Sequence, residues 1–197
     1  MSAPQLERLL LQLEIDQLNA AYAAVLDEKR FDEWPGFFLE EGRYQVQARE
    51  NFDRGLPLAL IDLESQGMMK DRVYGITQTI YHGPYYTRHV VSPAQVLGEE
   101  AGRVRAQSHY AVFRTRPGDA SEVYNVGRYL DEIVRTPDGL RFASRRCIYD
   151  SEMVLNSLIY PVERPAAASR CRRHSGARIA LADHSGRLRA SGGFLAK

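Results

Sequence analysis

The residues best suited to metal chemistry in this sequence are five histidines and two cysteines. A mononuclear non-haem iron site needs two histidines and a carboxylate on one face, and His82, His89 and Asp71 have the right side chains. Their spacing matches no known signature, so we favour ordinary roles in a turn and a strand. Cys147 and Cys171 are too few for a disulfide framework or for a four-cysteine zinc or iron–sulfur site. We therefore predict that this chain holds no metal and no catalytic centre.

General acid–base catalysis is a second chemistry that the side chains allow. Asp62, His89, Tyr110 and Asp131 are the candidates, because a helix-covered pocket in an α+β domain can shift the pKa of such groups. No spacing among them implies a role. The sequence also lacks a G-x-S-x-G motif, a phosphate-binding glycine loop and a dinucleotide fingerprint, which excludes those enzyme classes. A free-standing isomerase or dehydratase that uses Asp, His or Tyr remains an alternative.

Length and composition indicate one soluble domain followed by a basic extension. The chain has 197 residues and no apolar run long enough to span a membrane, and its first residues do not resemble a signal peptide, so we expect a cytoplasmic protein. We place the domain at residues 1–162. Residues 163–197 are rich in arginine and poor in large apolar residues, which predicts a flexible, dispensable segment. Its arginines lack stacking aromatic residues, so we expect no nucleic-acid binding.

The N-terminal half of the sequence predicts helices. Leucines and other apolar residues recur every three or four positions from Gln5 to about Asp27, as in an amphipathic helix. A short helix is expected at Phe31–Phe38, with Asp32 as its N-cap. We then expect a strand at Arg43–Ala48 and a loop at Arg49–Gly55. The secondary structure of the apolar stretch Leu56–Leu63 is undecided, and a further helix is expected at Ser65–Ile80.

The C-terminal half of the domain predicts an antiparallel sheet. Four long extended segments separated by glycine- and proline-containing turns suggest hairpins, at Arg88–Leu97, Val104–Thr115, Glu122–Thr136 and Leu140–Asp150. Helices followed by a meander indicate an α+β fold in which the helices cover one face of a curved sheet. Both alternating sets of side chains in residues 108–114 include large apolar residues. We therefore expect the second face to be covered by another protein chain.

Several motifs, in this order, resemble the small (β) subunits of Rieske-type aromatic-ring-hydroxylating dioxygenases. They cover about residues 15–162 and lie at Phe31–Phe38, Gly42–Tyr44, Asp71–Gly75, Tyr85–Val91, Asn125–Asp131, Asp138–Phe142, Tyr149–Met153 and Asn156–Pro161. Within the family, Arg49–Leu58 is most similar to the small subunits of salicylate 5-hydroxylase-type enzymes, with anthranilate and terephthalate dioxygenases as near relatives. Residues 163–197 depart from the family pattern.

The resemblance implies a cone-shaped NTF2-like (SnoaL-like) fold and a structural role. It implies an α3β3 hexamer in which the large (α) subunit carries the Rieske 2Fe-2S cluster and the mononuclear iron, while this chain supports assembly and has no activity alone. The expected substrate class is an aromatic carboxylate such as salicylate. We also expect a homotrimer of this chain, formed through the side of the sheet, with interface residues Tyr81, Tyr85, Tyr86, Arg88 and Arg128, because Tyr and Arg favour interface cores.

Overall fold

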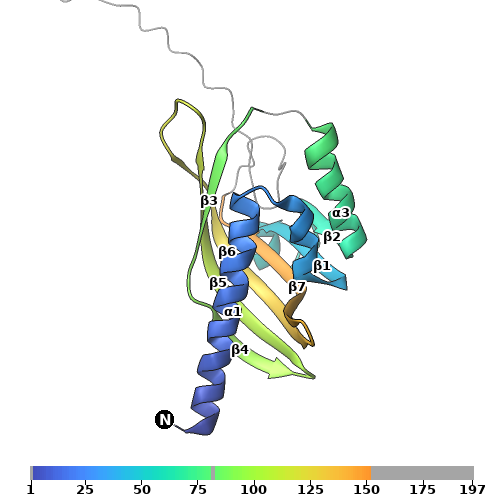
Figure 1. Cartoon of the computed structure of the whole chain (residues 1–197), viewed down its shortest axis with the longest axis vertical. Helices are drawn as coiled ribbons and strands as arrows, with labels where there is room; N and C mark the ends of the chain where they lie inside the picture. The colour runs from blue at the N-terminus through green and yellow to red at the C-terminus, as the bar shows by residue number, and fades with distance from the viewer. Residues whose placement is uncertain (1, 81–82, 152–197) are drawn as a thin grey trace, which may run out of the picture. The chain divides into compact units, whose positions relative to one another are not determined.

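The computed structural model describes residues 2–80 and 83–151, and all structural statements below concern these residues. The expected α+β fold is confirmed: the first and longest helix and most of the others pack on one face of a long mixed sheet (Figure 1). The helices are α1 (Ala3–Asp27), the 3-10 helix η1 (Phe31–Phe37), α2 (Arg49–Asp53), α3 (Gln66–Tyr74) and the π-helix η2 (Gly75–Thr79). The strands are β1 (Phe38–Ala48), β2 (Ile61–Leu63), β3 (Tyr86–Val91), β4 (Gln95–Glu100), β5 (Arg103–Thr115), β6 (Glu122–Thr136) and β7 (Gly139–Tyr149).

The sheet is larger than the predicted meander. Its seven described strands follow the order β2-β1-β7-β6-β5-β3, and β4 also pairs with β5. The hairpins β5–β6 and β6–β7 are antiparallel, as expected, but β1 lies parallel to β7, with Tyr44 opposite Arg145. The four predicted segments do pair antiparallel, although the first is divided in two. The expectation of a wholly antiparallel sheet was wrong at β1, because parallel pairing between segments about a hundred residues apart leaves no local signal.

The predicted strand Arg88–Leu97 is divided into β3 and β4. Ser92 ends β3: its backbone N–H donates to the His109 carbonyl at 2.8 Å, and its hydroxyl accepts from the His109 N–H at 2.9 Å. Pro93, which lacks an N–H donor, follows. The two short strands pair with opposite halves of β5, and β3 is an edge strand.

The helices agree with the prediction in position but differ in detail. Arg30, and not Asp32, is the N-cap of η1, and the expected loop Arg49–Gly55 contains α2. The predicted helix Ser65–Ile80 begins as expected, since the Ser65 hydroxyl accepts from the Met68 N–H at 3.3 Å. It changes into the π-helix η2 after Tyr74, and none of the described helices is long and apolar enough to cross a membrane.

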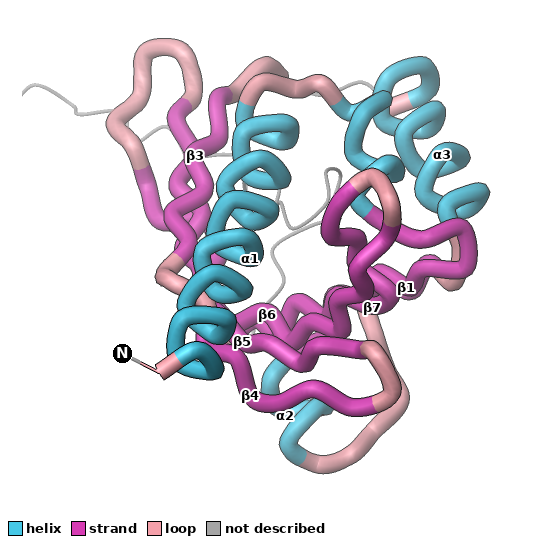
Figure 2. The backbone as a smooth tube through the Cα atoms, turned by 60° about the horizontal axis from the view of Figure 1, so that its bottom comes forward, coloured by secondary structure: helices cyan, strands magenta, loops and turns pink. Residues whose placement is uncertain are grey.

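The core lies between α1, η1, α3 and one face of the sheet, which we call the inner face. Its central residues are Tyr22, Trp34, Phe38, Tyr44, Tyr129 and Phe142. The opposite, outer face carries α2, which contacts β1 and β7 (Figure 2). Gly127 of β6 permits close strand contact, because a Cβ atom there would lie 2.1 Å from the Ile148 carbonyl oxygen.

Candidate functional site

A buried charged cluster occupies the inner face of the sheet. Arg145 of β7 donates to both carboxylate oxygens of Asp131 on β6, at 2.9 and 2.8 Å, and also to the side-chain oxygen of Asn19 on α1. The Arg145 side chain is fully buried. Its guanidinium carbon lies 3.9 to 4.4 Å from the ring centroids of Tyr22, Tyr129 and Phe142. This cluster ties α1 to the sheet.

The charge of this cluster is compensated locally. Burial opposes ionisation of Arg145, but the neighbouring Asp131 carboxylate more than offsets the effect and raises the guanidinium pKa above its usual range. A bidentate pair surrounded by aromatic rings compensates the buried charge, although Nη1 of Arg145 has no hydrogen-bond partner among the described residues. The Asp131 carboxylate is therefore held by the fold and is not available as a general base.

Tyrosines and one thiol surround the Arg145 cluster in a protonated state. Burial raises the pKa of Tyr22, Tyr110 and Tyr129 above their usual range, and it raises the pKa of the Cys147 thiol to about 12. Tyr110 stacks on Tyr129 with ring centroids 4.3 Å apart, and its hydroxyl donates to the Asn125 side chain at 3.0 Å. These groups pack the interior and do not supply a proton acceptor at neutral pH.

His89 belongs to a separate buried pair. Its ring Nδ1 lies 2.6 Å from an Asp27 carboxylate oxygen, and its backbone N–H also donates to that carboxylate, at 3.0 Å. Asp27 thus fastens the end of α1 to the edge strand β3. Asp71, the carboxylate that the sequence offered as a metal ligand, lies on α3, and His82 is outside the described residues.

The four acid–base candidates do not converge. Asp62 lies on β2 and accepts from Arg43 at 2.8 and 2.6 Å, an interaction that lowers the pKa of the Asp62 carboxyl. Tyr110 and Asp131 share the inner face but are held by different partners, and His89 is paired with Asp27. Within residues 2–80 and 83–151, no group of three His, Cys, Asp or Glu residues is placed to share a metal ion. The arrangement supports the interpretation that these residues are structural.

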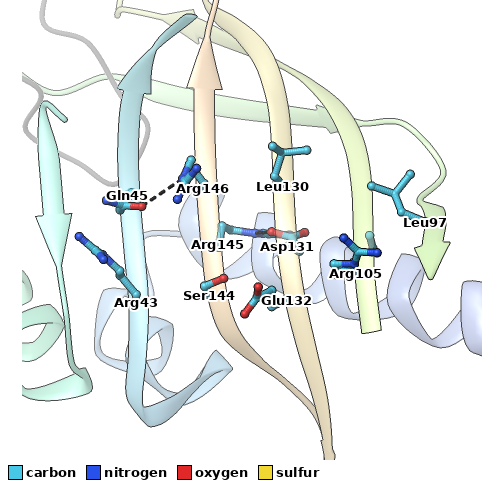
Figure 3. Close-up of a pocket in the computed structure, with 11 residues that line it drawn as sticks. Arg43, Gln45, Leu97, Arg105, Leu130, Asp131, Glu132, Ser144, Arg145 and Arg146 are labelled. Atoms are coloured by element: carbon cyan, nitrogen blue, oxygen red, sulfur yellow. Dashed lines mark hydrogen bonds and ion pairs between the residues drawn. The ribbon is translucent and has the colours of Figure 1, made fainter. Parts of the chain in front are cut away.

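The outer face of the sheet is polar, rich in arginine and concave. A depression of about 450 Å³ is bordered by side chains from β1, β7, β6, β5 and β4, among them Arg43, Arg146, Leu130 and Arg105 (Figure 3). Arg146 donates to the Gln45 side chain at 3.1 Å, and the dashed line in the figure marks this bond. Side chains from these five strands line a depression that is open to one side and not an enclosed cavity.

The predicted interface residues divide into four groups. Tyr86 and Arg88 of β3 are exposed, and their cross-strand partners are Thr115 and Phe113 of β5. Arg128 lies on the outer face over the ring of Phe52, at 5.4 Å. Tyr85 is buried within this chain, near Tyr124. Tyr81 is outside the described residues.

Sequence reasoning missed Arg145 and Asn19, which the structure places at the centre of the interior. Asn19 was visible as a polar residue in an apolar helix pattern. Arg145 follows Ser144 and precedes Arg146, and neither neighbour marks it as the buried arginine. Its inward direction depends on an irregularity in the β6–β7 pairing between Glu132 and Ile133.

A known protein family has the same kind of fold. Residues 7–146 match the family model described as a SnoaL-like domain, so the chain is a member of that α+β class. It is 36% identical over 149 residues to the anthranilate 1,2-dioxygenase small subunit of Burkholderia cepacia, covering 76% of this chain and 92% of that protein. It is 26% identical to a terephthalate 1,2-dioxygenase terminal oxygenase component, subunit beta 2, of a Comamonas species, covering 77% of this chain and 98% of that protein.

A solved structure agrees with these relatives. The beta subunit assigned to an aromatic-ring-hydroxylating dioxygenase of Novosphingobium aromaticivorans is 36% identical and superposes with a TM-score of 0.71, covering 78% of this chain and 97% of that one. The chain belongs to the family of small subunits of aromatic-ring-hydroxylating dioxygenases. The predicted family and fold class are therefore confirmed.

Proposed function

We propose that this chain is the structural small subunit of an aromatic-ring-hydroxylating oxygenase and has no activity alone. In this role it supports a large subunit that carries a Rieske 2Fe-2S cluster and a mononuclear iron, in an α3β3 hexamer in the cytoplasm. The observation that carries the proposal is the 36% identity across nearly the whole anthranilate dioxygenase small subunit.

The packed interior supports the same proposal. A free-standing isomerase or dehydratase of this fold would need an acid–base group open to a substrate. Here Asp131 is bound by Arg145 and Tyr110 is bound to Asn125. The His89 ring is paired with Asp27 through Nδ1, and its Nε2 is buried and not open to a substrate. The described residues thus use their candidate catalytic groups to hold α1 and the strands together.

We propose that copies of this chain meet through the outer face. Tyr86 and Arg88 offer exposed side chains on the edge strand, and Arg128 contributes a guanidinium beside Phe52. Tyr81 remains part of this prediction, and Tyr85 would act from beneath the surface by supporting β3. Tyrosine and arginine side chains combine apolar contact area with hydrogen-bonding groups, which suits an interface core.

We further propose an aromatic carboxylate, such as salicylate, as the substrate of the assembled enzyme. Two relatives are named for anthranilate and terephthalate, which both carry a carboxylate on an aromatic ring. As in the family that this chain resembles, the large subunit would largely determine which substrate is used.

Co-expression with a Rieske-type large subunit tests the proposal. We expect the two chains to co-purify, and we expect salicylate or anthranilate hydroxylation only when both are present with a suitable electron-transfer partner. If the small chain alone converted an aromatic acid, or if the purified large subunit were equally active and stable without it, the proposed structural role would be wrong.

A further inference from the structure

The depression on the outer face of the sheet has the size of a small-molecule site. Its volume of about 450 Å³ lies within the range of about 300–1,000 Å³ that such sites occupy. Tyr86, Arg88 and Arg128, which we propose for contacts between copies, are not among the residues that border it. The depression is therefore a part of the outer face to which the proposed function assigns no role.

Most charges around the depression are already compensated. Arg43 donates to Asp62 at 2.8 and 2.6 Å. Glu132, the acidic residue that borders the depression on the outer face, accepts from Arg103 at 3.3 Å. Arg145 also borders the depression, but its guanidinium belongs to the buried ion pair of the inner face. These groups leave little free charge of their own.

Two further arginines of the depression, Arg105 and Arg146, keep their charge. In the part of the chain that the structure describes, neither guanidinium forms an ion pair with an acidic side chain. Glu132 is the cross-strand neighbour of Arg105, yet its carboxylate pairs with Arg103. The depression therefore presents two guanidinium groups that lack a carboxylate partner among the described residues.

Arg146 is held in position by groups that do not neutralise it. Its Nε donates to the Gln45 side-chain oxygen at 3.1 Å, and its guanidinium carbon lies 5.7 Å from the centroid of the Phe52 ring. Its two terminal nitrogens make no hydrogen bond within residues 2–80 and 83–151. A guanidinium presents a planar pair of N–H donors that matches the two oxygens of a carboxylate. Arg146 is thus oriented in advance to bind an anion.

Apolar surface lies between the two free arginines. Figure 3 shows Leu130 with Arg146 on one side and with Arg105 and Leu97 on the other. Leu97 is 50% exposed, and Leu130 is half-buried. Ligand sites combine such apolar surface with a few polar groups that fix the orientation of the ligand. The depression therefore offers contact area to the body of a ligand as well as donors to its charged group.

We infer that this depression binds a small carboxylate with an apolar body. The carboxylate contacts the guanidinium groups of Arg146 and Arg105, and the apolar body covers Leu130 and Leu97. Both contacts are needed, because an exposed ion pair alone contributes little to binding. The inference does not depend on the proposed function, since binding is a property of this chain alone.

An NMR titration of the full chain with benzoate tests the inference. The ionic strength is held constant, because salt screens exposed charges. We expect saturable shifts in the signals of the residues that border the depression. We also expect benzoate to bind at least tenfold more tightly than acetate, which lacks the apolar body, and than benzyl alcohol, which lacks the charge. Absence of saturable binding, or equal binding of benzoate and either comparison compound, would overturn the inference.

The double variant Arg105→Gln/Arg146→Gln tests the residues. It should bind benzoate at least tenfold more weakly, while its urea unfolding remains unchanged because both side chains are exposed. Arg49→Gln/Arg54→Gln is the matched control, since it removes the same charge from α2, where these side chains are 57% and 64% exposed. The control should bind benzoate like the unaltered chain. Unchanged binding by the first variant, or an equal loss in the control, contradicts the assignment.

A second copy of this chain is the competing occupant of the depression. If acidic side chains of another copy covered Arg105 and Arg146, the unaltered chain would not bind benzoate, and its mass in light scattering would fall in the double variant. That result would overturn the inference. Association with the large subunit is measured separately by co-purification, so failure of the carboxylate site and failure of the proposed function are distinguishable.

Discussion

The two halves of α1 have the same apolar periodicity but different surroundings. In the C-terminal half, Tyr22, Val25 and Leu26 are buried against the sheet, and Asn19 joins the Arg145 cluster. In the N-terminal half, Leu6, Leu9, Leu10 and Leu13 are exposed. A periodic pattern thus reveals an apolar face of a helix without revealing whether that face is covered. The C-terminal half of α1 stabilises the fold, whereas the leucines of the N-terminal half are about half exposed.

The largest expected effect is the loss of the buried ion pair. Arg145→Ala should lower the free energy of unfolding by about 3–5 kcal/mol, because Asp131 would remain buried without its partner. Urea denaturation followed by circular dichroism measures this change. Arg146→Ala, on the outer face, is the control and should cost less than about 1 kcal/mol.

A double variant separates the effect of the unpaired charge from the effect of lost packing. Arg145→Met/Asp131→Leu removes both charges, and it should recover part of the stability lost in Arg145→Ala. If the double variant were less stable than Arg145→Ala, the loss would come from packing around the aromatic rings and not from an unpaired charge.

Truncation of one leucine in each half of α1 compares them directly. Leu26→Ala should destabilise the isolated chain by about 2–5 kcal/mol, because Leu26 is 1% exposed and its removal leaves a cavity. Leu10→Ala should change stability by no more than about 0.5 kcal/mol. Equal losses in the two variants, measured by urea denaturation of the isolated chain, would mean that Leu10 is already covered within the small subunit's own assembly.

Alkaline pH should weaken the interior. An unfolded thiol ionises around its usual pKa of 9.0, whereas burial raises the pKa of Cys147 in the folded chain to about 12. The folded state therefore binds more protons between these values, so stability should decline as pH rises from 9 to 12. Buried tyrosines contribute in the same direction. Cys147→Val should make the decline of the urea midpoint shallower, and an unchanged slope would contradict this account.

The smallest expected effect concerns the basic extension. Removal of residues 163–197 should leave the melting temperature and the binding of the large subunit nearly unchanged, because this segment has few large apolar side chains to bury. Calorimetry and co-purification of the truncated chain are the measurements. A loss of several degrees would show that the extension packs on the domain.

Sequence patterns predicted the regular parts of this fold well. The long periodicity of α1 and the turn at Asp138-Gly139, where Gly139 has a φ of 113°, located the longest helix and the β6–β7 hairpin. The parallel pairing of β1 with β7 and the division of β3 from β4 depend on contacts between distant segments. Such contacts have no local pattern, so single-sequence reasoning missed them.

The buried position of Arg145 could not be predicted from the sequence pattern of β7. Continuing the hairpin register outward from Ile133 and Phe142 would pair Arg145 with Leu130, which borders the outer depression. The register shifts by one residue between Ile133 and Glu132, so Arg145 pairs with Asp131 instead. This shift turns the Arg145 side chain toward the inner face. One extra residue in β7 thus decides which arginine is buried. The periodicity of α1 likewise predicted an amphipathic helix without indicating that Leu6, Leu9, Leu10 and Leu13 are exposed.

Native mass spectrometry of the co-expressed subunits is the most direct test of the structural role proposed for this chain. We expect a single complex that contains equal numbers of this chain and the large subunit, three of each, in which the iron belongs to the large subunit. A small chain that remains unassociated with the large subunit while it converts an aromatic substrate by itself would contradict that role.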